Sequence, residues 1–455
     1  MDMNQEIRRI AEYQNSILPR HEKKSEQAIS GIVSNAIAAY EHSCYDFTKY
    51  QTFKLKQVNK IREVKMYPLF SPEELICIYL KRSLDRKFHV TYPNRNSFMR
   101  SLFNTTYALK NMSDYTIVKF DFRDFFNSIS SAYVYKKYMQ NKNLERYQAN
   151  LLEEFVSTTK YAYAGLNTSN IICEIAALQF DSLVSQKLST YGIILYKRYI
   201  DDGIIIFNSY INQSECLNIL QQSIEEVFYD SQVVAPKCKT ALNTAKTKYI
   251  ARRNLSVGGA HQEFDFLGYQ FELWLESNNK TETTKFMYGI TQQKIDKYSK
   301  RISNIVEEYA RSSDRNMELL RHQIKAFTHR TVYQVNRYKT VIWKSKGFLS
   351  NYCELRFRMD ALTPSTEHFL KTAVIKAFSQ NSIALPYFLR SNQQESIYSL
   401  FNNFKNNSTL LFVELIGIDK KTLCKMCRQI GINIDSSKTY DGLVRDYLIA
   451  VKVGH

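Results

Sequence analysis

The run IILYKRYIDDGIIIF at residues 193–207 places two neighbouring carboxylates, Asp201 and Asp202, between two apolar segments. Short apolar runs joined by an Asp-Gly step are the strongest local signal for a β-hairpin. We therefore predict a hairpin over these residues, with both carboxylates at its tip. An Asp-Gly turn alone is ordinary hairpin chemistry, so a functional meaning needs support from other acidic positions.

A third carboxylate stands at the end of another predicted strand. Residues 115–122 read YTIVKFDF, and the alternation of their apolar side chains is typical of a strand. Because carboxylates at the ends of adjacent strands can converge, we expect Asp121 to lie near Asp201 and Asp202. Such a cluster can hold two Mg²⁺ ions for phosphoryl transfer.

The chain is large, basic and rich in aromatic residues. Its 455 residues exceed the usual size of one hydrophobic core, which favours two or three domains. The 62 Lys and Arg against 44 Asp and Glu give a net charge of +18, and there are 32 Tyr and 27 Phe. Positive charge combined with aromatic rings suits single-stranded nucleic acid, which offers phosphates and stackable bases.

The sequence gives no sign of export or membrane insertion. The N-terminal residues MDMNQEIRRI lack the apolar core of a secretory signal, and no apolar run approaches the length of a membrane span. The eight cysteines are scattered, as expected of free thiols in a reducing compartment. We therefore expect a cytoplasmic protein with no membrane partner.

Four motifs in chain order resemble those of the reverse transcriptase family. RYIDD at residues 198–202 resembles the active-site hairpin, FDFRDFF at residues 120–126 the first catalytic strand, and FLGY at residues 266–269 the primer-grip hairpin. Phe126 matches the aromatic steric gate against a ribose 2′-hydroxyl. The resemblance covers roughly residues 50–275. It implies an α+β right-hand polymerase with fingers and palm, acting as an RNA-directed DNA polymerase.

The resemblance also implies roles for individual residues. The two Mg²⁺ ions would be held by Asp121, Asp201 and Asp202 together with the backbone of Phe122. The ring of Phe126 would select deoxynucleotides. The primer grip would comprise Phe266, Leu267, Gly268 and Tyr269.

A basic segment precedes the first of these motifs. Residues 56–62 read KQVNKIR and resemble the fingers segment that clamps the incoming triphosphate. Arg62 is the first candidate for this contact, followed by Lys56 and Lys60, because charge-assisted hydrogen bonds suit a polyphosphate. An edge strand protected by its lysines is an alternative explanation.

Two further segments resemble parts of the same family. Residues 165–169 (GLNTS) resemble the loop that opens the template-contacting helix, which implies a nucleotide contact for Ser169; a simple helix cap is the alternative. Residues 242–247 (LNTAKT) resemble the segment whose lysine lies near the leaving pyrophosphate, so Lys246 is a candidate general acid. Lys239 offers a rival alignment.

From about residue 288 the apolar spacing becomes that of amphipathic helices. We predict an N-terminal helical extension over residues 1–48, fingers and palm over 49–275, and a basic all-α C-terminal domain over 276–455. Basic residues in one presumed helical stretch of the last region are candidates for a nucleic-acid-binding face: Arg321, Lys325, Arg330 and Arg337. A solvated charged helix face is the alternative.

The RYIDD form, Glu174 after the Ser169 segment and the helical C-terminal region most resemble abortive-infection and unknown-group reverse transcriptases. These are bacterial antiphage defence proteins. The resemblance implies an RNA template, with a dedicated noncoding RNA as one candidate, a DNA product, and a homo-oligomer or a partner defence protein. Synthesis without a template is a further option. The alternative function is a nucleic-acid-binding scaffold or a maturase-like splicing factor on the same fold.

Overall fold

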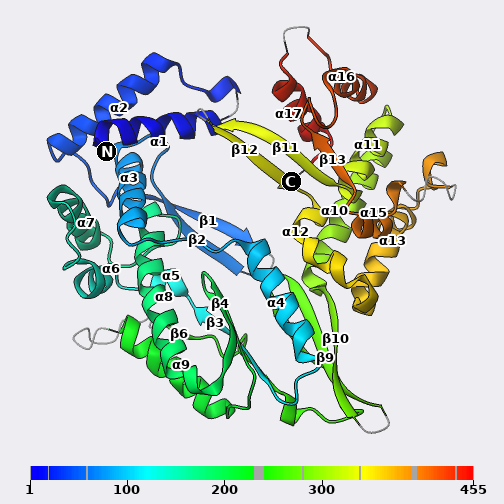
Figure 1. Cartoon of the computed structure of the whole chain (residues 1–455). Coiled ribbons are helices and arrows are strands. Elements are labelled where there is room, and N and C mark those ends of the chain that lie inside the picture. Colours follow the sequence, from blue (N-terminus) through cyan, green and yellow to red (C-terminus); the bar gives the residue numbers. More distant parts are fainter. Residues whose placement is uncertain are drawn as a thin grey trace. The chain divides into compact units, whose positions relative to one another are not determined.

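In the computed structural model the chain forms two compact units. Figure 1 shows the chain with its colours following the sequence. The first unit contains the residues up to Phe98 together with Met112–Asn254, and the second contains Met99–Asn111 and the chain from Leu255 onward. The structure describes residues 2–18, 20–57, 60–229, 240–278, 281–337, 340–390, 397–435 and 438–453.

The first unit begins with the helices predicted from the sequence. Helix α1 spans Met3–Ile17 and α2 spans Glu26–Glu41. Helix α3, Pro72–Lys87, starts at the N-cap Ser71, whose side chain accepts a hydrogen bond from the backbone N–H of Glu74. Between α2 and α3, strands β1 (Gln51–Gln57) and β2 (Lys60–Met66) form an antiparallel hairpin.

The remaining helices of this unit are α5 (Phe125–Ser128), α6 (Ser131–Val134), the π-helix η2 (Tyr135–Met139), α7 (Arg146–Thr158), α8 (Asn167–Lys187) and α9 (Gln213–Phe228). Short 3₁₀ turns lie at η1 (Arg20–Glu22), η3 (Ser189–Tyr191) and η4 (Arg252–Asn254). Helix α4, Arg95–Leu109, begins in the first unit and continues into the second.

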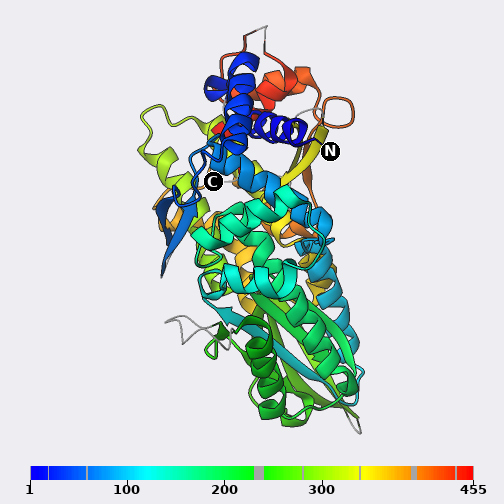
Figure 2. The same ribbon diagram turned by 90° about the vertical axis from the view of Figure 1, so that its left-hand side faces the viewer.

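An antiparallel sheet in the first unit carries the acidic motifs. Its strand order is β4-β5-β3-β6, and β7 also pairs with β3. The strands are β3 (Thr116–Arg123), β4 (Ile193–Tyr199), β5 (Asp202–Phe207), β6 (Ala241–Leu242) and β7 (Lys248–Ala251). The predicted strand and hairpin are therefore both present. Figure 2 shows α8 and α9 running alongside these strands.

Aromatic packing joins this sheet to the two helices. Phe122 of β3 lies 5.1 Å from Phe180 of α8 and 5.8 Å from Phe228 of α9, measured between ring centroids. Phe120 and Phe122 are buried on one face of β3, as their alternation predicted. Asp121 lies between them in sequence, so it is on the opposite face of the strand.

The turn of the β4–β5 hairpin differs from the expected one. Tyr199 pairs with Asp202, so the two turn residues are Ile200 and Asp201, and the Asp-Gly step lies within β5. Gly203 is needed for packing instead: a Cβ there would lie 2.1 Å from the ring of Phe120. The Asp-Gly pair therefore predicted the hairpin correctly, but the turn is formed by Ile200 and Asp201 instead of Asp202 and Gly203.

The second unit contains a three-stranded antiparallel sheet in the order β10-β9-β8. Strand β8 spans Gln262–Phe266, β9 spans Tyr269–Asn278 and β10 spans Thr281–Ile290. The hairpin expected at FLGY, residues 266–269, is thus present. Since Thr283 of β10 pairs with Glu276 of β9, the predicted domain boundary near residue 276 lies inside a hairpin, whereas the two compact units separate at residues 254 and 255.

Most of the later chain is helical. Its helices are α10 (Gln292–Arg311), α11 (Met317–Thr328), α12 (Phe348–Asn351), η5 (Cys353–Ala361), α13 (Pro364–Gln380), η6 (Tyr387–Leu389), α15 (Leu400–Asn406), α16 (Lys420–Gln429) and α17 (Tyr440–Ala450). In α10 the buried face includes Ile295, Tyr298, Ile302 and Ile305, as the apolar spacing predicted.

The C-terminal region is not entirely helical. Strands β11 (Arg330–Arg337), β12 (Thr340–Lys346) and β13 (Thr409–Phe412) form a sheet in the order β12-β11-β13. The segments TVYQV and TVIW are rich in β-branched and aromatic residues, which favour strands over helices. The mixed α and β content of the chain is as predicted, but the expectation of an all-α C-terminal domain was wrong because of this sheet.

Seven cysteines lie in the described part of the chain, and each has a free thiol. Within the same residues, no helix has both the length and the apolar character needed to span a bilayer.

A buried histidine is expected to make the second unit sensitive to acid. His329 is 7% exposed, and its Nδ1 lies 3.2 Å from the Thr328 hydroxyl. Burial, assisted by the charge of Lys325, lowers the pKa of His329 from 6.5 to about 4. The unfolded chain therefore binds this proton first as the pH falls. We expect the free energy of unfolding to decrease by roughly 3 kcal/mol between pH 6.5 and 4 through this residue.

Denaturant unfolding of His329→Gln across this pH range tests the prediction. The variant should show a shallower loss of stability with acid than the wild type. Replacement of the exposed His368 by Gln is the matched control and should leave the slope unchanged. Equal slopes for wild type and His329→Gln would show that His329 does not account for the acid sensitivity.

Candidate active site

Three carboxylates meet at the end of β3 and the β4–β5 turn. Asp121 is 2% exposed and is paired in register with Asp202, the first residue of β5. The backbone N–H of Phe122 donates a 3.0 Å hydrogen bond to the carbonyl of Asp201. Two strands that are distant in sequence therefore hold Asp121, Asp201 and Asp202 together, as the acidic motifs predicted.

This environment disfavours charge on the hairpin carboxylates. Burial and the nearby charge of Asp121 raise the pKa of Asp201. Burial, together with a hydrogen bond to Asp121, raises the pKa of Asp202 to about 7. Buried carboxylates that repel one another are stabilised by a cation between them.

Lys246 supplies positive charge to Asp121. Its Nζ lies 2.9 Å from Oδ2 and 3.1 Å from Oδ1 of that carboxylate. Burial alone would lower the pKa of Lys246, but the hydrogen bond and the charge of Asp121 outweigh it and raise the pKa. This contact supports the alignment of residues 242–247 with the lysine segment of reverse transcriptases, which made Lys246 the candidate. The rival Lys239 lies outside the described residues.

Asn243 is a site residue that the sequence did not reveal. Its backbone N–H donates to the carbonyl of Asp121 over 2.8 Å, and its side-chain amide donates to Asp121 Oδ1 over 3.0 Å. The backbone N–H of Lys246 in turn donates to the Asn243 carbonyl over 3.0 Å. Asn243 therefore orients both Asp121 and the turn that carries Lys246. A lone Asn after a two-residue strand carries no recognisable signal.

The donor chemistry of the site fits a hard divalent cation, since Mg²⁺ prefers carboxylate oxygens. Asp121, Asp201 and Asp202 supply three carboxylates in a largely buried setting, with the Lys246 ammonium on Asp121. Across the described ranges, no group of three or more His, Cys, Asp or Glu has the arrangement of a formed metal site.

Arg62 and Phe126 lie close to each other in the first unit. The guanidinium carbon of Arg62 is 5.9 Å from the centroid of the Phe126 ring, and the Arg62 side chain is exposed. The charge of Arg62 also favours the ionised form of Asp201. The side chains of Lys56 and Lys60 lie outside the described part of the structure. Phe126 is half-buried on α5 and contacts the ring of Phe125.

Ser169 is less accessible than its predicted role requires. It lies in the first turn of α8 and is completely buried, next to Thr168, whose hydroxyl donates to the Cys77 carbonyl over 3.1 Å. The N-cap of α8 is Leu166, so Ser169 does not cap the helix either. The structure gives the predicted nucleotide contact of Ser169 no support.

The FLGY segment joins β8 to β9 in the second unit, with Leu267 and Gly268 as the two turn residues. Leu267 and Gly268 have φ of 48° and 82°, the left-handed values that a type I′ hairpin turn requires. Phe266 and Tyr269 are buried, and the Tyr269 hydroxyl donates to the Asn351 carbonyl over 3.3 Å. The aromatic residues of the segment therefore anchor the hairpin in its own unit.

The four basic C-terminal candidates do not share one helix. Arg321 and Lys325 lie on α11, whereas Arg330 and Arg337 lie on β11. Arg321 donates to the Tyr398 hydroxyl over 2.8 Å, and burial lowers the pKa of Lys325. The expectation of a single helical face was wrong because the chain changes to a strand at Arg330.

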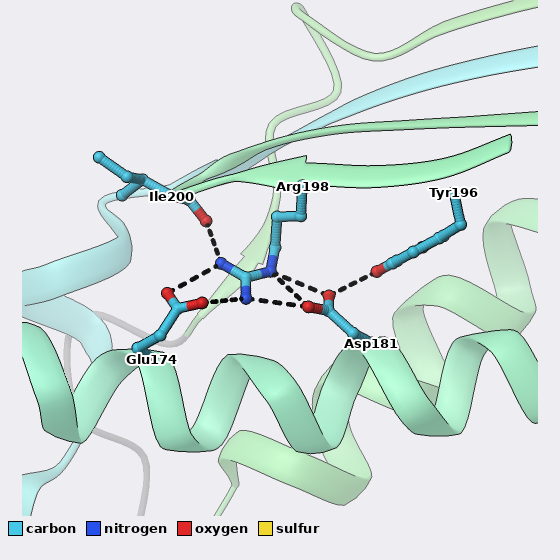
Figure 3. Close-up of polar contacts among 5 residues, drawn as sticks. All are labelled: Glu174, Asp181, Tyr196, Arg198 and Ile200. Atoms are coloured by element: carbon cyan, nitrogen blue, oxygen red, sulfur yellow. Dashed lines mark hydrogen bonds and ion pairs between the residues drawn. The ribbon is translucent and has the colours of Figure 1, made fainter. Parts of the chain in front are cut away.

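A buried charge cluster lies beside the acidic turn (Figure 3). Arg198 of β4 donates to Asp181 Oδ1 and Oδ2 and to Glu174 Oε1 and Oε2 over 2.8–3.2 Å. It also donates to the carbonyl of Ile200 over 2.9 Å. The Tyr196 hydroxyl completes the cluster with a 2.6 Å hydrogen bond to Asp181. The sequence identified the RYIDD motif but not this role for its arginine.

Comparison with known proteins identifies the domain that contains this site. Residues 48–271 match the family model described as reverse transcriptase (RNA-dependent DNA polymerase). These residues therefore match a reverse transcriptase domain. No curated protein matches the sequence significantly.

Solved telomerase structures show a distant likeness. Telomerase from Candida albicans, in complex with a fragment of telomeric RNA, is 12% identical with a TM-score of 0.40; the match covers 88% of this chain and 60% of that one. Apo telomerase from Candida tropicalis is 15% identical with a TM-score of 0.36, covering 50% and 53% respectively. This chain thus matches less than two thirds of either telomerase chain.

Proposed function

We propose that this protein is an RNA-directed DNA polymerase whose active site is the carboxylate cluster of β3 and the β4–β5 turn. The observation that supports it most is the convergence of Asp121, Asp201 and Asp202 with Lys246, inside the segment that matches the reverse transcriptase model. Such a set of buried carboxylates beside a lysine suits nucleotidyl transfer.

In the proposed mechanism, Asp121, Asp201 and Asp202, with the Phe122 carbonyl, would hold two Mg²⁺ ions. Such ions would supply activation of the primer 3′-hydroxyl and neutralisation of charge on the triphosphate. Lys246, whose ammonium lies 2.9 Å from Asp121, is the candidate general acid toward the leaving pyrophosphate. Arg62 would contact the triphosphate.

The metal assignment predicts a change in stability that does not depend on catalysis. Mg²⁺ at about a hundredfold excess over its Kd should stabilise the wild type by roughly 2.7 kcal/mol. Asp121→Asn should show little of this effect, since the central carboxylate is lost. Asp114→Asn, which removes the partner of the exposed Arg253, is the matched control and should respond as the wild type does. Equal responses of all three proteins would remove Asp121 from the metal site.

Primer extension tests the polymerase proposal. The purified chain is given Mg²⁺, dNTPs and an RNA template with a DNA primer, with a reaction lacking divalent ions as control. Template-dependent extension that requires Mg²⁺ supports the proposal. Tight RNA binding without incorporation by protein that is demonstrably folded would favour the alternative, a nucleic-acid-binding scaffold or maturase-like splicing factor.

We further propose that the enzyme acts in the bacterial cytoplasm in antiphage defence, with RNA as its template. The support is the sequence resemblance to abortive-infection and unknown-group reverse transcriptases. The basic residues of α11 and β11 are candidate contacts with nucleic acid, and a homo-oligomer or a defence protein is a candidate partner. Plaque counts on bacteria expressing wild type or Asp201→Asn test this role: equal phage yields with both would oppose it.

A further inference from the structure

The cluster around Arg198 connects helix α8 to the turn that carries Asp201. Figure 3 shows Glu174 and Asp181 rising from one face of α8 toward the guanidinium, with the Ile200 carbonyl on its other side. The Arg198 side chain is only 3% exposed. All three of its nitrogens donate, so each end of the guanidinium is fixed by a carboxylate or a carbonyl.

The turn that Arg198 contacts has an unfavourable backbone. Ile200 has a φ of 60°, in the left-handed region that β-branched residues rarely adopt. Its carbonyl accepts the hydrogen bond from Arg198. The next residue, Asp201, is tied to β3 through the hydrogen bond from the Phe122 N–H. The strained Ile200 residue therefore immediately precedes the residue that carries the Asp201 carboxylate.

We propose that Arg198, Glu174 and Asp181 are positioning residues that hold the strained Ile200 turn and so place Asp201 for catalysis. The predicted effect of these residues on the reaction rate rests on the proposed polymerase function, whereas their predicted effect on the Ile200 turn does not. Glu174 and Asp181 fix Arg198 from α8, and Arg198 fixes the turn. The cluster thus acts through Asp201 and contacts no substrate itself.

The chemistry of the cluster favours this explanation over simple stabilisation. Buried ion pairs are seldom more stabilising than apolar side chains of the same volume, because both charges lose their hydration. A planar guanidinium, however, has five N–H donors in fixed directions and can join two carboxylates and a carbonyl at once. A lysine at this position keeps the charge but has three donors on one atom.

The first test is Arg198→Lys. We expect kcat to fall about 10- to 100-fold, because small displacements of a catalytic group have effects of this size. The KM for dNTP should change by less than about threefold, because no group that binds the nucleotide is removed. Arg253→Lys, in the exposed pair with Asp114 of the same unit, is the matched control and should keep the wild-type kcat.

A double-mutant cycle separates positioning from general stability. Asn adopts a positive φ more readily than a β-branched residue. The cost of Arg198→Lys in kcat should therefore be smaller when Ile200 is replaced by Asn than when it is replaced by Val. Equal costs in the two backgrounds would overturn the proposal, because the cluster would then act independently of backbone strain.

Hydrogen exchange of the amides of residues 200–202 gives a readout that needs no activity. Exchange should be at least about tenfold faster in Arg198→Lys than in the wild type, as expected when a local structure is released. Glu174→Gln is a milder second variant if Arg198→Lys does not fold, and it should give a smaller change in the same direction. An inactive wild type would refute the polymerase function alone, whereas unchanged exchange in folded variants would refute the positioning role.

Discussion

Asp201→Asn is expected to lower nucleotide incorporation by about 10³-fold or more. Phosphoryl transfer depends on positioning and electrostatic stabilisation, so the loss of a metal carboxylate removes the main source of catalysis. Asn has nearly the same shape as Asp but no charge. Because burial and the charge of Asp121 raise the pKa of Asp201, the neutral amide should not destabilise the fold. Single-turnover incorporation of one dNTP measures the rate directly.

The matched control for this variant is Asp114→Asn. Asp114 belongs to the same unit and pairs with Arg253, which is 63% exposed. This substitution should leave the rate within about twofold of the wild type, as expected for an exposed ion pair. If Asp201→Asn has the stability of the wild type and also retains its rate, the carboxylates of the β4–β5 turn are not catalytic.

Phe126→Ala should weaken discrimination between deoxyribonucleotides and ribonucleotides. The ring of Phe126 is half-buried near Arg62, the candidate triphosphate contact. Truncation to a methyl group opens space for a 2′-hydroxyl. We expect the ratio of kcat/KM for dCTP over CTP to fall by roughly 10- to 100-fold, the range that one steric contact typically supplies.

Phe228→Leu provides the comparison for Phe126→Ala. Phe228 is buried, and its ring lies 5.8 Å from that of Phe122, so the change alters the core without opening the proposed gate. Sugar selectivity should be unchanged in this variant. A selectivity in Phe126→Ala equal to that of the wild type would reject the gate assignment, even if both variants lose some activity.

The local patterns of the sequence predicted most of the elements around the site. The strand with Asp121 and the hairpin over residues 193–207 have strong period-two or turn signals, and the FLGY hairpin was expected from its resemblance to a primer grip; all three are present. The position of the β4–β5 turn could not be predicted. Gly203 is required by the ring of Phe120, which is more than eighty residues away in sequence.

Interactions between distant segments account for what the sequence did not predict. Arg198 meets Glu174 and Asp181 because β4 packs beside α8, and no spacing rule connects a strand residue to a helix in this way. The strands β11 and β13 pair in parallel across a long intervening segment, so no short-range turn signal marks them. The roles of Arg62, Phe126 and the primer grip remain predictions, and Phe126→Ala tests the second of them.

The most direct test of the central claim is to sequence the product made on an RNA of defined, mixed sequence. The purified chain is supplied with Mg²⁺, labelled dNTPs and this RNA, and the Asp201→Ala, Asp202→Ala double variant is run in parallel. We predict DNA complementary to the RNA from the wild type, lost on RNase treatment before the reaction, and no DNA from the variant. Complementary DNA from both proteins at similar yield, or none from folded wild type, would contradict the assignment of this carboxylate site.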